Sequence, residues 1–424
     1  MYISIYKERN AKIINGYKHL HTERHLVMLD KIKKYQTRLQ KSFNITYRRY
    51  LYHTIDFDDK MVAVFGARGV GKTTLLFQYL GELQEHGSNA LYISLDYPFL
   101  SGADLIELVE EFVESGGEFL LLDEVHRYEA FASHLKTIYD LFDISVIFTG
   151  SSATSILNAK SDLSRRVTLY HLNGFSFREY LEVKYKLSLN SYTLEDIVND
   201  HIKIANSIEK NSFDILKEFG TYLKTGYYPF YFDKKSSYYQ NLLNTINLTI
   251  DLDLTSLGLI EQKYTYKLKK LLEVICESKP FEVNYSKIAT MAEISRVKLY
   301  DYVSYLNDGQ MLLLVDENIT GLKKVQKPAK IYLNNTNLLY AYCESAEIGT
   351  VRETFFANQV ASHYPLHISK QGDFILSKKY TIEIGGRDKG FDQIKDISES
   401  YVVSDDIMIG TGNRIPLWLF GFLY

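Results

Sequence analysis

Eight consecutive residues, Gly66 to Thr73, combine residue types that suit the binding of a phosphate group. They read Gly-Ala-Arg-Gly-Val-Gly-Lys-Thr, and the glycines allow successive backbone N–H groups to approach a bound anion closely. Lys72 supplies a positive charge, and Thr73 supplies a hydroxyl that can ligate Mg²⁺. An apolar run, MVAVF, precedes the motif and a helical pattern follows it, which is the strand–loop–helix setting of a nucleotide-binding P-loop. The residues expected to contact the nucleotide are Gly66, Ala67, Arg68, Gly69, Val70, Gly71, Lys72, Thr73 and Thr74.

Two adjacent acids, Asp123 and Glu124, end the apolar run FLLL fifty residues after the motif. A carboxylate at the end of a neighbouring strand can hold Mg²⁺ together with Thr73, and the next acid can orient and deprotonate an attacking water. The spacing therefore predicts ATP and Mg²⁺ as cofactors. It also predicts ATP hydrolysis, with Lys72 and Glu124 as catalytic residues.

Further polar residues follow the next apolar run, SVIFT. Thr149 and Ser151 are candidates to contact the γ-phosphate or the attacking water, and simple turn residues are the alternative. Arg165 and Arg166 come just before the last apolar run. An arginine at this place can reach the nucleotide of a neighbouring subunit, which would imply a homo-oligomer, whereas the alternative is a solvated basic turn.

The elements that must position these residues alternate between apolar strands and amphipathic helices. Continuous apolar strands separated by helices predict a parallel α/β sheet covered on both faces. After Ser176 the pattern becomes helical, residues 266–315 suggest a three-helix unit followed by a hairpin, and residues 351–424 return to mixed α/β. The strands are expected at Met61–Phe65, Ala90–Asp96, Glu118–Asp123, Ser145–Thr149 and Val167–Leu172.

Composition restricts the class of protein. The chain has 424 residues, too many for one ordinary core, so two to four domains are expected. Cys276 and Cys343 are the only cysteines, which excludes a disulfide framework and a zinc finger and favours a reducing cytoplasm. No apolar run is long enough for a membrane helix. The tail Ile415–Tyr424 is predicted to be a buried closing strand, with a membrane or partner anchor as the alternative.

Charge is unevenly distributed along the chain. Residues 1–55 carry a net charge of +9 against −3 for the whole chain, so the remaining residues carry −12. This basic, mostly helical arm is rich in tyrosine, whose rings could stack on bases of an anionic partner. Packing of the arm on the acidic remainder of the chain is the alternative. The expected contacts to an anion are Lys33, Lys34, Arg48 and Arg49, interleaved with Tyr35, Tyr47 and Tyr50.

Several motifs together resemble a known group of proteins. The P-loop, LLLDEVHR, IFTGSSA, SDLSRRVTLYHLNGFSFREYL and KTGYYPF are similar to those of prokaryotic AAA-type ATPases of the AAA_14/DUF4143 and archaeal-ATPase group. The resemblance spans residues 55–424 and implies an ASCE-type P-loop core followed by helices, a winged helix and a restriction-endonuclease-like α/β domain. The expected boundaries are 1–55 for the arm, 56–175 for the ATPase core, 176–260 for a helical lid, 261–335 for the winged helix and 336–424 for the nuclease-like domain.

The segment Lys287–Leu306 fits a helix-turn-helix, with Ser295 as the N-cap of the second helix. Arg296, Lys298 and Tyr302 would then point outward. Many winged helices bind proteins, so contact with double-stranded DNA and a structural linker role both stay open.

For the nuclease-like domain, the resemblance implies a metal site built from Glu353, Asp373 and Glu383. The lysine that would assist these carboxylates belongs two residues after Glu383, where this chain has Gly385. Either Arg387 or Lys389 would have to replace it, so metal binding with weak or no cleavage is expected.

The function expected from these features is an ATP-driven, DNA-associated conformational switch or motor. The alternative is an ATP-controlled signalling scaffold that binds proteins and carries a non-catalytic nuclease-like domain. A small-molecule kinase is disfavoured, because no second substrate motif follows the acids.

Overall fold

The computed structural model describes residues 27–43, 46–100, 102–150, 163, 165–277, 285–317 and 329–424. Their contacts divide the chain into two compact units. The first unit holds the described residues up to Phe65 and those of Lys72–Gly150 and Ser155–His171. The second unit holds Gly66–Gly71 and Leu172–Tyr424. Within the described residues, no helix is sufficiently long and apolar to cross a membrane.

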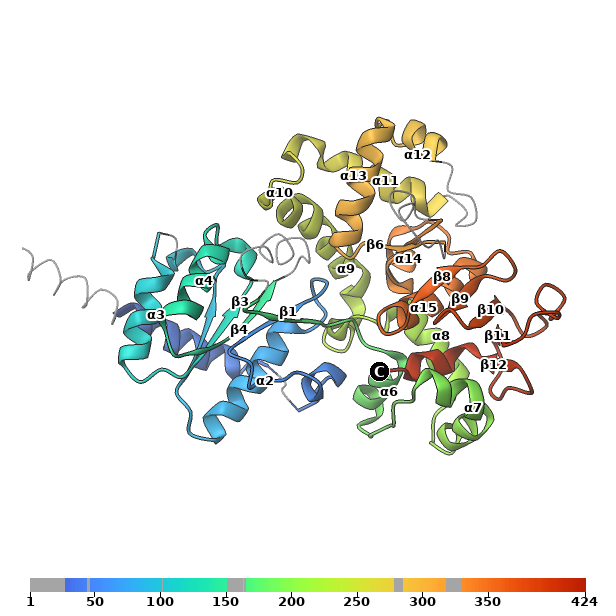
Figure 1. Ribbon diagram of the computed structural model, residues 1–424, viewed down its shortest axis with the longest axis horizontal. Helices are drawn as coiled ribbons and strands as arrows, with labels where there is room; N and C mark the ends of the chain where they lie inside the picture. Colours follow the sequence, from blue (N-terminus) through green and yellow to red (C-terminus); the bar gives the residue numbers. More distant parts are fainter. Residues whose placement is uncertain are drawn as a thin grey trace, which may run out of the picture. The chain divides into compact units, whose positions relative to one another are not determined.

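The first unit is built on a parallel sheet of five strands in the order β2-β3-β4-β1-β5 (Figure 1). Its inner strands are buried almost throughout, as their apolar sequences require. The sheet confirms the predicted P-loop NTPase fold, because β4 lies between the strand before the P-loop and the strand that ends in Asp123. The strands are β1 (Met61–Phe65), β2 (Ala90–Ser94), β3 (Phe119–Asp123), β4 (Ser145–Gly150) and β5 (Thr168–His171).

Among the described residues of the first unit, three helices follow strands: α2 (Lys72–Glu85), α3 (Leu105–Glu114) and α4 (Phe131–Leu141). An earlier helix covers residues 27–40. Its Leu29 and Ile32 belong to the same apolar core as the sheet, and its Gln36 accepts a hydrogen bond from the Tyr92 backbone N–H at 2.7 Å.

The described part of the basic arm thus packs on its own unit. Arg48 pairs with Glu82 at 2.7 Å, Arg49 is buried, and the Tyr35 ring lies 5.2 Å from that of Phe99. Lys33 and Lys34 are exposed. Of the two expectations for the arm, these contacts favour packing over stacking on bases for Tyr35, Arg48 and Arg49.

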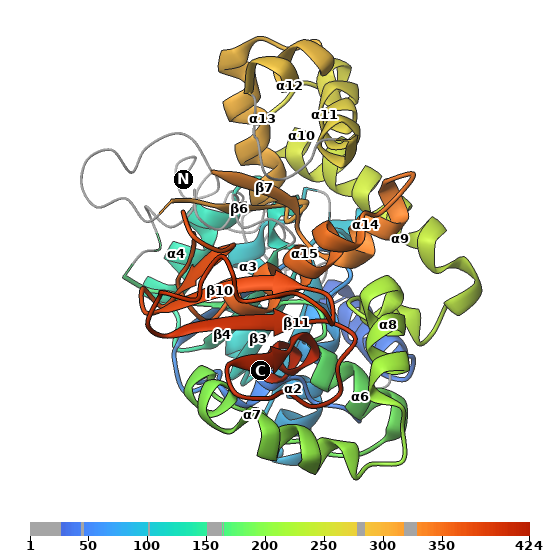
Figure 2. The ribbon, with the colours of Figure 1, turned by 90° about the vertical axis from the view of Figure 1, so that its right-hand side faces the viewer.

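The second unit starts with helices α6 (Phe177–Tyr185), α7 (Leu194–Glu209), α8 (Ile215–Thr225) and α9 (Tyr238–Leu248). A π-helical turn, Thr249–Asp253, joins α9 directly to the short α10 (Leu254–Ser256). Three more helices lie together in Figure 2: α11 (Thr265–Glu277), α12 (Tyr285–Met291) and α13 (Arg296–Asp308). The antiparallel pair β6 (Leu312–Val315) and β7 (Lys330–Leu333) follows them.

Two expectations for this region are corrected. Tyr302 is only 6% exposed, because it lies on the same side of α13 as Leu299 and Val303 and helps to bury that side. Cys276 and Cys343 form a disulfide, although no disulfide was expected. Their separation of 67 residues gives no local sequence signal, and the fold brings the end of α11 beside Cys343, the residue after helix α14 (Thr336–Tyr342).

The last module of the second unit is a five-stranded mixed sheet in the order β12-β11-β10-β9-β8. Helices α14 (Thr336–Tyr342) and α15 (Ile348–Ala361) precede it. Its strands are β8 (Leu366–Ile368), β9 (Phe374–Leu376), β10 (Tyr380–Gly385), β11 (Ser400–Ser404) and β12 (Arg414–Pro416). The tail is buried as expected, but it is mostly not a strand: Leu417–Phe422 form 3-10 turns that pack Trp418 and Phe420 into the core.

Candidate nucleotide site

The glycines of residues 66–73 are required by the backbone. Gly69 and Gly71 have φ angles of 85° and 103°, a region that side chains disfavour. A Cβ atom on Gly66 would lie 2.2 Å from the Leu172 carbonyl oxygen, which leaves no room for it. The chain passes from Gly71 directly into α2, whose first residue is the buried Lys72. The loop therefore has the backbone geometry expected of a P-loop.

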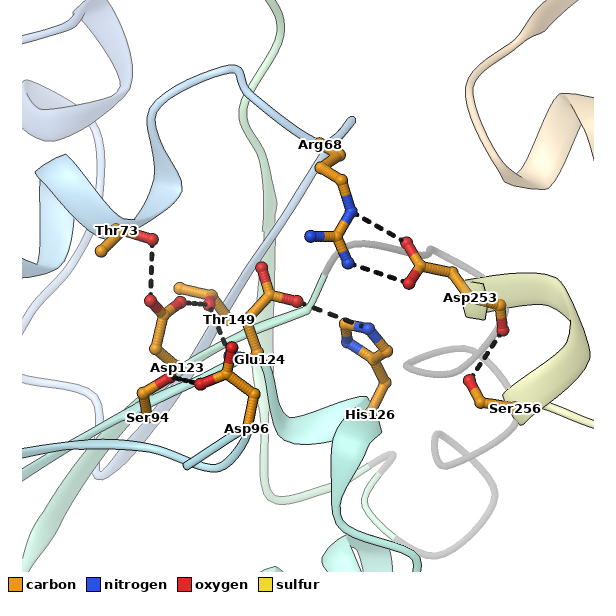
Figure 3. A network of polar contacts seen from close by, with 10 residues as sticks. All are labelled: Arg68, Thr73, Ser94, Asp96, Asp123, Glu124, His126, Thr149, Asp253 and Ser256. Carbon is orange, nitrogen blue, oxygen red and sulfur yellow. Dashed lines mark hydrogen bonds and ion pairs between the residues drawn. The ribbon is translucent and has the colours of Figure 1, made fainter. Parts of the chain in front are cut away.

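Asp123 is surrounded by hydroxyl donors (Figure 3). Thr73 Oγ1 donates to its Oδ2 atom at 2.7 Å, and the Tyr92 hydroxyl donates to the same atom at 2.9 Å. Thr149 Oγ1 donates to Oδ1. The structure thus brings together three of the residues that the sequence singled out, Thr73, Asp123 and Thr149, at the carboxyl ends of β3 and β4 and the start of α2.

Tyr92 was missed by sequence reasoning. Burial, and then the adjacent Asp123 carboxylate, raise the pKa of Tyr92 far above its usual value. Its hydroxyl therefore stays protonated and can act only as a donor to Asp123. Tyr92 lies within the apolar strand ALYIS, so the simpler interpretation was an ordinary residue of the apolar core. Only the alternation of side chains between the two faces of the strand could have suggested a role at the site.

Glu124 has an unusual backbone conformation, with φ 56° and ψ 43°. Left-handed geometry in a residue other than glycine is uncommon and is concentrated at functional sites. Its N–H donates to Thr149 Oγ1 at 3.3 Å, and its Oε2 atom lies 3.4 Å from Nε2 of the buried His126 (Figure 3). Thr149 therefore contacts both acids, and His126 is a second residue that sequence reasoning missed.

The remaining catalytic candidates differ in their surroundings. Ser151 lies outside the described residues. Arg166 forms a bidentate pair with Asp140 of α4, at 2.8 Å and 2.9 Å, and this pairing lowers the pKa of the Asp140 carboxyl. Arg165 is exposed. Arg166 is thus held by a carboxylate of its own chain.

Arg68, expected to contact the nucleotide, is engaged by a carboxylate of the π-helical turn Thr249–Asp253. Its guanidinium donates to both oxygens of Asp253, at 3.3 Å from Nε and 2.9 Å from Nη2. Asp253 lies 185 residues further along the chain, so nothing in the motif itself could predict the contact.

The three carboxylates expected to bind metal gather around two lysines in the last module. Glu353 accepts hydrogen bonds from the Tyr332 hydroxyl at 2.6 Å and from Lys330 at 3.1 Å. Asp373 lies 3.9 Å from the same amine, and Glu383 pairs with Lys389. Burial raises the pKa of all three carboxyls, and the neighbouring lysines oppose that shift.

The metal centre expected from these three carboxylates stays a prediction. In the described part of the chain, no group of three or more His, Cys, Asp or Glu side chains is placed to hold a metal ion. Lys330 pairs with Glu353 and lies 3.9 Å from Asp373, and Lys389 pairs with Glu383, so these two amines offset the charge of the carboxylates.

Lys389 explains why residue 385 is glycine. A Cβ atom on Gly385 would lie 2.5 Å from Cβ and Cγ of Lys389, because the lysine side chain lies directly over the glycine. With its amide oriented to donate, Gln393 also approaches Glu383 Oε2 at 3.0 Å. The sequence left open whether Arg387 or Lys389 reaches back to Glu383. In the structure it is Lys389 that does so.

Comparisons with known proteins cover most of the chain. Residues 58–181 match the AAA_14 family, described as an AAA domain, and residues 216–347 match a domain of unknown function, DUF8612. An uncharacterized protein of Methanocaldococcus jannaschii is 27% identical over 408 residues, which is 87% of this chain and 86% of the relative.

Two DnaA structures are similar to part of this chain. AMPPCP-bound DnaA from Aquifex aeolicus is 15% identical, with 60% of this chain and 84% of that chain covered and a TM-score of 0.24. Domain III of the Thermotoga maritima replication initiation protein DnaA is 16% identical, with 42% and 92% covered and a TM-score of 0.24. TM-scores this low support no inference. The AAA-domain match and the strand order β2-β3-β4-β1-β5 together identify residues 58–181 as a P-loop ATPase-type domain.

Proposed function

We propose that this protein binds ATP with Mg²⁺ at residues 66–74 and hydrolyses it. The observation that carries the proposal is the convergence of Thr73, Thr149 and Glu124 on or beside Asp123. The Thr73 hydroxyl and the Asp123 carboxylate are hard oxygen donors 2.7 Å apart, which suits Mg²⁺. When bound, Mg²⁺ would neutralise charge on the β- and γ-phosphates.

The protein groups have distinct tasks in this reaction. Lys72 and the loop N–H groups hold the phosphates, and Thr149 fixes the position of Asp123 and of the Glu124 backbone. The Glu124 carboxylate takes a proton from water as the water oxygen bonds to the γ-phosphorus. The bond from that phosphorus to the β–γ bridging oxygen breaks, and ADP leaves with the electron pair.

Glu124→Gln tests this assignment. The variant should bind a fluorescent ATP analogue with unchanged affinity and lose at least about 100-fold in turnover, the lower range for a general base. Glu118→Gln is a matched control, because Glu118 lies just before β3, at the opposite end of the strand, where it accepts a hydrogen bond from Asn89 N–H. Turnover of Glu124→Gln close to that of Glu118→Gln would contradict the role of Glu124.

We further propose that ATP turnover serves a DNA-associated switch or motor. The support is the succession of α12 and α13, which are separated by only four residues as a helix-turn-helix requires, with Arg296 and Lys298 exposed at the start of α13. Ser295 caps that helix by accepting a hydrogen bond from Lys298 N–H at 3.3 Å. The neighbouring Asp301, 3.5 Å from Lys298, weakens the positive potential, so a protein-binding scaffold remains the second candidate.

Duplex DNA distinguishes the two candidates. A DNA-associated enzyme should show DNA-stimulated ATP turnover and a gel shift that weakens steeply with salt. Arg296→Ala and Lys298→Ala should reduce both effects without changing turnover in the absence of DNA. Turnover that is indifferent to DNA, with no gel shift, would favour the scaffold.

A further inference from the structure

The apex of the phosphate-binding loop is anchored by a buried carboxylate. Both side-chain oxygens of Asp253 accept hydrogen bonds from Arg68 (Figure 3), and the Asp253 side chain is 0% exposed. A buried carboxylate depends strongly on its partner, because removing one member of such a pair leaves an uncompensated charge. The conformation of residue 68 and the position of Asp253 are therefore linked.

Aromatic rings limit the movement of the next loop residue. The Phe230 ring lies 3.0 Å from the position that a Cβ atom on Gly69 would take, and Tyr228 lies 3.8 Å from it. These two rings stack on each other, with centroids 5.4 Å apart. The Tyr228 hydroxyl in turn accepts a hydrogen bond from Asn335 at 3.2 Å. The loop apex thus packs against the aromatic rings of Tyr228 and Phe230.

The π-helical turn that carries Asp253 also contacts the three-helix unit. Asp251, two residues earlier, pairs with Lys269 of α11 at 2.6 Å. Residues two apart on a helix point to nearly opposite sides, so one carboxylate of the turn holds the loop and the other holds α11. Thr249 also lies 3.3 Å from the Cβ position of Gly309, just after α13. π-helical turns within helices occur frequently at functional sites.

We infer that Asp253 is a positioning residue of the phosphate-binding loop, and that the turn Thr249–Asp253 couples the nucleotide-bound state of the loop to α11. The inference rests on the proposed ATP binding. A phosphate group orders the backbone N–H groups of residues 66–71 around itself, and Arg68 and Gly69 belong to that backbone. Any adjustment of the loop displaces the Arg68 guanidinium, and the buried Asp253 can follow only if its turn shifts against Lys269.

Hydrogen exchange followed by mass spectrometry tests the coupling in the full chain. Addition of Mg²⁺ and a non-hydrolysable ATP analogue should slow exchange in Thr249–Asp253 and in α11 of the wild-type protein. Asp253→Asn should weaken analogue binding by about 5-fold, at the lower end for coupled sites, and should remove most of the response of α11. Asp253→Glu, which keeps the charge, should restore part of both effects.

Glu182→Gln is the matched control, because it removes a buried carboxylate from a different arginine pair of the same unit, Arg178–Glu182 at 2.7 Å. It should leave analogue binding and the α11 response intact. A second variant, Asp251→Asn, cuts only the link to α11 and should bind the analogue normally while losing the α11 response. This variant keeps the test decisive if Asp253→Asn fails to fold.

The outcomes separate the inference from the proposed function. Normal analogue binding and an unchanged α11 response in Asp253→Asn, or an unchanged α11 response in Asp251→Asn, would overturn the inference alone. Failure of the wild-type protein to bind the analogue would overturn the proposed function and the inference with it.

Discussion

Asp123 shows how a single side chain organises the candidate site. It accepts hydrogen bonds from three hydroxyl groups, which come from α2, β2 and β4. Hydrogen bonds to an ionised acceptor are stronger than neutral ones. The carboxylate is therefore oriented before any cation arrives, and each donor that is lost should loosen it.

The Tyr92→Phe substitution removes one donor and keeps the ring. We expect turnover to require a several-fold higher Mg²⁺ concentration, and stability to fall by about 1.5–3 kcal/mol, the range for a hydrogen bond to a charged group. Mg²⁺ titration of ATP turnover and chemical denaturation measure the two effects. Tyr79→Phe is the control, since Tyr79 is also buried and stacks on Phe57. Equal Mg²⁺ requirements in both variants would refute a role for the Tyr92 hydroxyl.

At the second cluster, lysine amines neutralise the carboxylates that were expected to bind metal. Incubation of plasmid DNA with the protein and Mn²⁺ should therefore give no cleavage above the level of Glu383→Gln, which removes the charge that pairs with Lys389. A platform that binds but does not cut is the expected role. Robust cutting that disappears in Glu383→Gln would show that a cation can displace the lysines.

At the scale of elements, the disulfide joins the end of α11 to the residue that follows α14. Its loop of 67 residues should stabilise the second unit by on the order of 4 kcal/mol in the chain-entropy description. Trp418 is the only tryptophan and is buried in that unit, so its fluorescence reports unfolding there.

Reduction should therefore lower the denaturant midpoint of the Trp418 signal. The variant Cys276→Ser with Cys343→Ser should start from the lower midpoint and show no response to the reductant. Peptide mapping without reductant should recover the Cys276–Cys343 pair. Recovery of only free thiols from protein kept under air would contradict the pairing.

The strands of the first unit could be predicted because each is a short apolar run next to a distinctive polar residue. The sequence placed Asp123 and Thr149 at the ends of such runs and Thr73 in the first turn of the helix that follows another, and parallel pairing brings these places together. Contacts between distant segments could not be predicted in this way. Asp253 and Tyr92 are ordinary residues in their own segments, and only the packed fold gives them partners at Arg68 and Asp123.

The buried side of α13 shows a second limit of prediction from the sequence. Tyr302 occupies the helical position between Leu299 and Val303, and its phenol suits either water or the core. The structure buries it, because the apolar stripe of this helix is wider than its aliphatic residues alone suggested. The cluster around Lys330 was also beyond prediction, since that lysine comes from β7, outside the expected motif.

At the scale of the whole molecule, Arg165 and Arg166 lead to a prediction about cooperation between chains in hydrolysis. If Arg165 or Arg166 reaches a neighbouring subunit, turnover per chain should rise with protein concentration. Arg165→Ala and Arg166→Ala should abolish that rise, with losses of about 1,000-fold or more if the side chain stabilises transition-state charge.

Asp140→Asn separates a structural role of Arg166 from a catalytic one. It breaks the pair with Arg166 and leaves the arginine in place. If Arg166 only braces α4, Asp140→Asn and Arg166→Ala should be equally impaired. A rate that does not depend on concentration and is unchanged in the arginine variants would indicate a site complete within one chain.

The contacts of Arg68 and Gly69 with residues much later in the chain have a consequence for protein synthesis. A ribosome would complete the whole AAA-domain match at residue 181 well before Phe230 and Asp253 emerge. Until then, the loop lacks the ring that packs on Gly69 and the carboxylate that holds Arg68. The nascent chain should thus acquire its mature affinity for ATP only after residue 253 has emerged.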